Sequence, residues 1–241
     1  MTIRSQVAIM WWGVTFLVIF GFSWYFLLGM IPIPPATWSS QEVAAFYTEN
    51  SYRMRWGALI CSWTGAFMIP IYAVQAVQIA RLERGNLPIW AVLQFGGGVM
   101  MTLFLVMPPL MWGVAAYDPG RPADVTNLMH QFANLMLVTT DQYFVFQMVP
   151  LTVMALTKND PLSPFPRWFG YFNIWVALMF EFGVAGFIPR SGPFAWDGLF
   201  VFWIPLTLFG IWVPTMVVLM LKALKRQARA EAEGVDLAGT P

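Results

Sequence analysis

Three ionisable residues interrupt apolar stretches of this sequence and could carry out acid–base chemistry. Asp141 lies in TTDQYFVFQ, Glu181 lies in ALMFEFGVAGFIP, and His130 is the only histidine. An ionisable side chain in hydrocarbon costs at least about 2.5 kcal/mol on insertion scales, so it usually faces a bundle interior and serves a function. Two carboxyl groups close together in a low-dielectric site do not both ionise easily. We therefore expect one of them to keep its proton near neutral pH and to act as a general acid.

Further polar residues could orient the polar end of a substrate. At about 100° per residue, Asn134 lies about 40° and Asp141 about 20° around a helix from His130, which predicts one shared face. The predicted catalytic residues are Asp141, Glu181 and His130, and the predicted substrate-binding residues are Asn134, Arg55, Asn173 and Gln142. The alternative is that these side chains only join helices, because a protonated carboxyl is also a good interhelical hydrogen-bonding group.

The composition requires a bilayer around these residues. Of the 241 residues, 59 % are hydrophobic and 10 % are charged, whereas soluble domains carry about a quarter of charged residues. With one cysteine and one histidine, the chain cannot build a disulfide framework, a multi-cysteine metal site or a bis-histidine haem site. We therefore predict neither metal nor cofactor. The net charge of +1, with basic residues spread along the loops, argues against nucleic acid as a partner.

Apolar segments of about 20 residues or more predict an all-α bundle of six transmembrane helices. The predicted spans are residues 7–31, 55–80, 88–115, 128–156, 168–189 and 196–222. If the N-terminus is cytoplasmic, nine of the 13 basic residues lie on the inner side, which favours two cytoplasmic termini. We expect one transmembrane domain over residues 1–225 and a polar, disordered cytoplasmic tail over residues 226–241.

Local motifs add detail to this bundle. Ser39 followed by Glu42 predicts a capping box, and the apolar residues after it recur at helical spacing. We expect a short amphipathic helix there, in the first outer loop, lying on the membrane surface. Gly96 to Gly98 form a GGG run without the Gly-Lys-Ser or Gly-Lys-Thr of a phosphate loop, which favours close helix packing.

Three stretches resemble a known group of proteins when taken together: FYTENSYRMRWG at 46–57, PRWFGYFNIWVAL at 166–178 and SGPFAWDGLFVFW at 191–203. They are similar to a largely uncharacterised family of multi-span membrane proteins from actinobacteria and proteobacteria. The resemblance implies a bacterial cytoplasmic membrane and carries over no activity. By length and by its carboxyl pair alone, the chain is also similar to small integral-membrane terpene cyclases, which serve here as an analogy for mechanism.

These observations leave three functions open. The first is a site within the bundle that binds a lipophilic isoprenoid- or steroid-like molecule and transforms it by acid–base chemistry of the isomerisation or cyclisation type. The second is a non-catalytic accessory subunit of a membrane enzyme complex, with a membrane protein as partner. The third is a proton-coupled carrier that uses Asp141 and Glu181 as proton sites.

Overall fold

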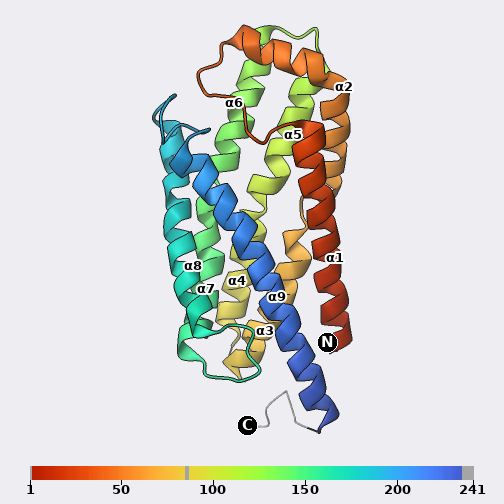
Figure 1. Ribbon diagram of the computed structural model, residues 1–241, viewed down its shortest axis with the longest axis vertical. Coiled ribbons are helices and arrows are strands. Elements are labelled where there is room, and N and C mark those ends of the chain that lie inside the picture. Colours follow the sequence, from red (N-terminus) through yellow and green to blue (C-terminus); the bar gives the residue numbers. More distant parts are fainter. Residues whose placement is uncertain (1, 85–86, 235–241) are drawn as a thin grey trace.

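The computed structural model describes residues 2–84 and 87–234, and the regular elements in these ranges are all helical (Figure 1). The α-helices are α1 (Ile3–Phe22), α2 (Ser40–Thr64), α3 (Met68–Glu83), α4 (Ile89–Met101), α5 (Leu103–Tyr117), α6 (Ala123–Thr139), α7 (Phe144–Thr157), α8 (Arg167–Phe180) and α9 (Ile204–Ala232). Short π or 3₁₀ elements adjoin them: η1 (Ser23–Leu28), η2 (Asp141–Tyr143), η3 (Glu181–Phe187) and η4 (Leu199–Trp203).

Several of these segments are long and apolar enough to cross a membrane. Within the described ranges there are five: Ile3–Leu28, Ser40–Glu83, Ile89–Tyr117, Arg167–Phe187 and Leu199–Ala232. Large apolar side chains are exposed on their outer surfaces, as expected where lipid replaces water. The structure therefore supports an all-helical, multi-pass membrane protein.

The predicted fourth span, residues 128–156, is not one continuous helix. It consists of α6 and α7, of 17 and 14 residues, separated at Thr140 and the single turn of η2. The hydroxyl groups of Thr139 and Thr140 each donate a 2.7 Å hydrogen bond to a carbonyl oxygen four residues earlier. Such bonds compete with the regular helical pattern and bend helices. The structure therefore does not confirm that the chain has six spans.

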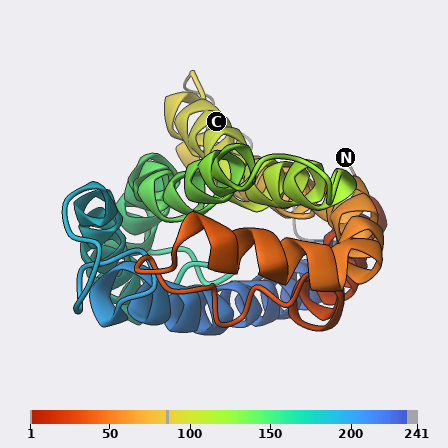
Figure 2. The ribbon, with the colours of Figure 1, turned by 90° about the horizontal axis from the view of Figure 1, so that it is seen from above.

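The predicted short outer helix is not separate either. The capping box is confirmed, since the Ser39 backbone N–H donates to Glu42 Oε2 at 2.7 Å and the Glu42 N–H donates to Ser39 Oγ at 3.3 Å. The helix that it starts, however, runs on without a break to Thr64. Figures 1 and 2 show its first turns lying across one end of the bundle.

The C-terminal helix extends beyond the predicted domain boundary at residue 225. It continues through Ala232, so the first part of the predicted tail is helical. Tertiary contacts hold this part in place, because Arg226 donates to the Ser163 carbonyl and Gln227 donates to the Leu162 carbonyl. The rest of the predicted tail, residues 235–241, lies outside the described residues.

The GGG run packs helices closely, as the sequence predicts. A side chain at Gly97 would meet the Phe146 backbone at 2.8 Å, and one at Gly98 would meet the Tyr72 ring at 2.6 Å. Gly96 has open space instead. Gly97 and Gly98 therefore let α4 lie directly against α7 and α3, and the contacts among these helices agree.

Candidate functional site

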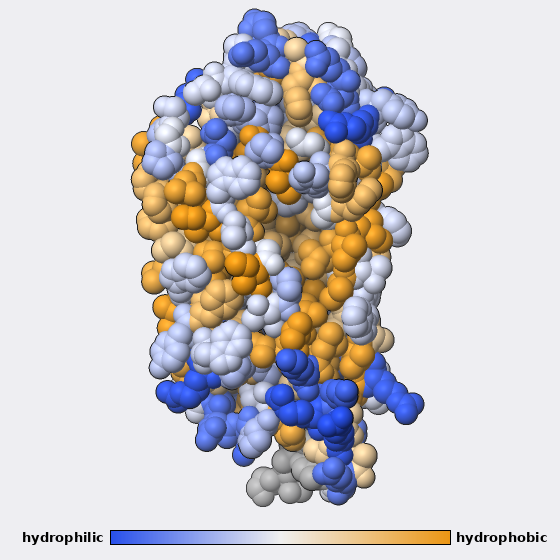
Figure 3. Space-filling model, in the orientation of Figure 1, coloured by the Kyte–Doolittle hydropathy of each residue, from blue (hydrophilic) through white to orange (hydrophobic). Residues whose placement is uncertain are grey.

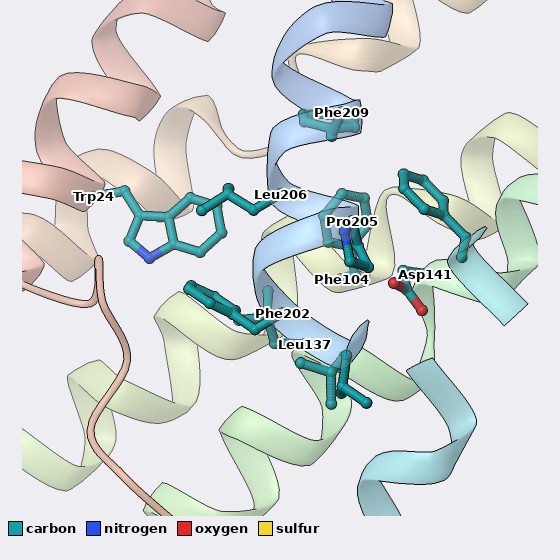
Figure 4. Close-up of a pocket in the computed structure, with 11 residues that line it drawn as sticks. Trp24, Phe104, Leu137, Asp141, Phe202, Pro205, Leu206 and Phe209 are labelled. Carbon is teal, nitrogen blue, oxygen red and sulfur yellow. The ribbon is translucent and has the colours of Figure 1, made fainter. Parts of the chain in front are cut away.

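A small pocket lies in the bundle beside the interruption between α6 and α7 (Figure 4). Its volume is about 40 Å³, and its walls come from η1, η2, η4 and four α-helices. The lining residues are Trp24, Phe104, Leu137, Val138, Asp141, Phe180, Val201, Phe202, Pro205, Leu206 and Phe209. One carboxyl group and one indole N–H are the polar side-chain groups of this lining.

Asp141 is the acidic residue of this pocket. It begins η2, is only 4 % exposed, and its Oδ1 atom has no hydrogen-bond partner within the described chain. Gly183 of η3 makes this position possible, because a Cβ atom there would overlap both the Val138 carbonyl oxygen and the Asp141 carboxyl. A buried acceptor without a partner is costly, so an unpaired carboxyl oxygen beside a cavity indicates a group that awaits a donor.

Trp24 supplies a second unpaired polar atom. Its indole N–H is buried and donates to no partner among the described residues. Figure 4 shows Trp24 and Asp141 on opposite sides of the group of lining side chains, with Phe202 and Leu206 between them. The lining residues therefore include one with an unused donor and one with an unused acceptor, among aromatic and aliphatic side chains. Sequence reasoning missed Trp24, because a tryptophan in a membrane helix normally indicates only an interface or a packed core.

Glu181 lies near Asp141 along the fold but does not share its pocket. It begins η3, which packs against η2, yet its side chain is exposed on the outer surface of the bundle. Its exposed neighbours Leu178 and Phe182 make that surface apolar. The expectation that both carboxyl groups face the bundle interior is therefore wrong for Glu181, because it lies one residue, or about 100° of turn, beyond Phe180 on the buried face of α8.

His130 belongs to a chain of hydrogen bonds that joins three helices. Trp112 Nε1 donates to Asn134 Oδ1 at 3.0 Å, Asn134 Nδ2 lies 2.9 Å from His130 Nε2, and His130 Nδ1 lies 3.0 Å from the Tyr47 hydroxyl. These four residues are at most 2 % exposed. None of them lines the pocket that contains Asp141.

The donors in this chain determine the protonation of the histidine. An indole N–H can only donate, so the amide oxygen of Asn134 must face Trp112 and its NH₂ must face His130. Nε2 of His130 then accepts, which leaves Nδ1 to carry the proton of a neutral ring. His130 and Asn134 are thus fully engaged in joining α2, α5 and α6.

The other predicted binding residues are dispersed. Arg55 is exposed on α2, with its guanidinium carbon 5.2 Å from the ring centre of Tyr117. Asn173 accepts a 2.6 Å hydrogen bond from Trp212 Nε1 inside the bundle. Gln142 is half-buried beside Asp141, and its Oε1 has no partner in the described chain. The pocket lining includes none of these three residues.

Buried glutamines form a polar cluster that sequence reasoning did not single out. Gln75 Oε1 accepts from Gln94 Nε2 at 2.5 Å and from Gln147 Nε2 at 2.9 Å, and all three side chains are fully buried. We name these three residues the glutamine cluster. Gln78, one turn further along α3, instead donates from Nε2 to Oε1 of Gln6 and of Gln227, and its own Oε1 accepts from Gln227 Nε2. The signal available in the sequence was a glutamine pair, Gln75 and Gln78, inside an apolar span.

Within residues 2–84 and 87–234, no group of three or more His, Cys, Asp or Glu side chains could hold a metal ion. Comparisons with protein-family models, with curated proteins and with solved structures found no match to the chain. The resemblance to multi-span bacterial proteins therefore stays a prediction.

Proposed function

We propose that this protein binds a small lipophilic molecule, whose polar end enters the pocket beside Asp141. One observation carries the proposal: Asp141 and Trp24 line the same apolar pocket, and each has a buried polar atom, Oδ1 and Nε1, without a partner within the described residues. Ligand sites typically combine apolar walls with a few such polar groups. A hydroxyl group could donate to Asp141, and a hydroxyl or carbonyl oxygen could accept from Trp24.

The pocket volume sets the part of the ligand that it can hold. About 40 Å³ takes a polar end group but not a ring system. The body of an isoprenoid- or steroid-like molecule would then lie between η1 and α9, which supply the lining residues Trp24 and Leu206. Figure 3 supports this route, because the face formed by α1 and α9 is hollowed and hydrophobic residues surround the hollow.

The chemistry that fits this pocket is proton donation by Asp141. Neither predicted partner supports it there, because Glu181 lies on the outer surface and both ring nitrogens of His130 are already bonded. Isomerisation or cyclisation needs a group that takes a proton back, and the lining offers no second acid or base. Ligand binding is therefore the activity that we place first.

We also propose six membrane crossings, with both termini in the cytoplasm of a bacterium. Two observations support this topology. Figure 1 shows α6 and α7 following one another along the bundle, so together they could complete a crossing. The same view places both ends of the described chain at the end of the bundle that carries the loop between α7 and α8. That end includes Arg81 and Arg84, as the positive-inside rule expects of the cytoplasmic side.

A second function is favoured by the exposed carboxyl group of Glu181. An ionisable side chain that faces lipid in the middle of a span is costly, and a helix of another protein could supply a partner for it. The ion pairs of the described residues all use Asp160, so Glu181 has no cationic partner there. A role as an accessory subunit of a membrane complex would explain this surface.

One experiment separates the two functions. Native mass spectrometry of protein extracted gently from its own membranes would compare the wild type with Asp141→Asn, Trp24→Phe and Glu181→Gln. We expect a lipophilic adduct in the wild type and in Glu181→Gln, and a decrease of about tenfold in the two pocket variants. An adduct that is unchanged in all variants would overturn the proposed site. A protein partner that is lost only in Glu181→Gln would instead support the accessory subunit.

A further inference from the structure

A second and larger groove lies between the beginning of α1 and the end of α9. Its volume is about 970 Å³, which far exceeds that of the pocket beside Asp141. Its lining residues are Thr2, Ile3, Arg4, Val7, Trp11, Leu221, Leu224, Lys225, Ala228, Glu231 and Ala232. Figure 3 shows hydrophilic residues gathered at this end of the molecule, below a band of hydrophobic ones.

The groove has a cationic rim. Arg4 in the first turn of α1 and Lys225 in α9 are both exposed, and neither makes an ion pair within the described residues, where both salt bridges use Asp160. Glu231 is the acidic residue of the lining, and it lies six residues beyond Lys225, or about 9 Å along the helix. The lining therefore carries a net charge of +1.

The floor of the groove is apolar and leads away from the two cations. Val7 and Trp11 follow Arg4 along α1, and Leu221 precedes Lys225 by one turn of α9. Trp11 is 54 % exposed, so it presents a large ring to whatever lies in the groove. This order of residues, with cations at the end of the bundle and apolar side chains deeper, matches a lipid that has a charged head and a hydrocarbon tail.

We infer that this groove binds an anionic phospholipid. The phosphate lies between Arg4 and Lys225, where a guanidinium can donate two hydrogen bonds and an ammonium adds a point charge. One acyl chain follows the apolar floor past Trp11. Basic pockets between helices at the membrane surface select anionic headgroups because each nearby cation contributes to their attraction. The net positive lining selects phosphatidylglycerol over phosphatidylcholine, whose headgroup is neutral as a whole.

The test uses purified full-length protein, stripped of lipid and reconstituted with mixed phosphatidylglycerol and phosphatidylcholine. Native mass spectrometry then counts the phospholipid retained. The groove variant is Arg4→Gln with Lys225→Gln, and the matched control is Lys222→Gln with Arg229→Gln. The control removes the same charge from exposed positions of α9 outside the groove lining.

We expect the wild type to retain phosphatidylglycerol in preference to phosphatidylcholine, with a loss of about tenfold in the groove variant and less than twofold in the control. Lys225→Arg keeps the positive charge and should therefore retain the lipid. This variant shows whether the charge, and not a change in the fold, determines retention. Equal retention of both lipids by the wild type would overturn the proposal. An equal loss in the groove and control variants would also overturn it, because general surface charge would then be sufficient.

Discussion

The tautomer of His130 is a direct consequence of the hydrogen bonds around it and can be tested by removing one partner at a time. Tyr47→Phe deletes the hydroxyl group that lies 3.0 Å from His130 Nδ1. The Nδ1–H group then becomes a buried donor without an acceptor, because Tyr47 and His130 are both at most 2 % exposed. We expect little cavity formation, since only one oxygen atom is removed.

The size of the effect follows from this unpaired donor. Leaving a buried N–H unsatisfied costs about 1–3 kcal/mol of unfolding free energy. For a chain of this length, 1 kcal/mol shifts the melting temperature by about 2–4 °C, so Tyr47→Phe should lower Tm by about 2–12 °C. The matched control is Tyr171→Phe, because Tyr171 is 59 % exposed and makes no hydrogen bond within the described residues. Its Tm should change by no more than about 2 °C.

NMR gives the decisive readout, since His130 is the only histidine and one labelled ring supplies the whole signal. In the wild type, ¹⁵N shifts of labelled histidine should show a protonated Nδ1 and an unprotonated Nε2. Trp112→Phe removes the donor that orients the Asn134 amide, so the amide can turn over and the Nε2–H form should become populated. A wild-type ring that is protonated at Nε2, or at both nitrogens, would refute the reasoning.

Two further predictions concern packing around the pocket and the glutamine cluster. Gly183→Ala should destabilise the protein by about 1–3 kcal/mol, because the new Cβ overlaps a backbone carbonyl of α6 and the Asp141 carboxyl. The control is Gly210→Ala, which lies in open space on α9 and should be neutral or stabilising by up to about 1 kcal/mol. Equal unfolding free energies for these two variants, measured in the same detergent, would contradict the close approach at Gly183. Gln75→Met should cost about 2–6 kcal/mol, since it leaves two buried NH₂ groups unpaired, whereas replacing the whole glutamine cluster by methionine should recover most of that loss. A triple variant that is less stable than the single one would show that the cluster does more than satisfy its own bonds.

The sequence alone predicts the features of this protein that depend on hydrophobicity and on interactions between residues close together in the sequence. An excess of apolar residues and a lack of charge predict a helical membrane protein, and the described part of the chain has five segments able to span a bilayer. The capping box depends on Ser39 and Glu42, which are only three positions apart. The close packing at Gly97 and Gly98 depends on the absence of a side chain. Such signals survive in any tertiary arrangement.

The composition of the pocket, in contrast, is decided by helix rotation and by one break in a helix. Extrapolating a regular turn from His130 puts Asp141 on the same face, but the phase is lost at Thr140, so the two residues occupy different environments. Glu181 faces outward because it lies one residue, or about 100° of turn, beyond Phe180, the last residue on the buried face of α8. Trp24 and Asp141 are more than a hundred residues apart in the sequence yet line the same pocket, and no local pattern predicts this. Rotation and pairing of helices depend on side chains from several segments packing at once, and only the tertiary structure determines them.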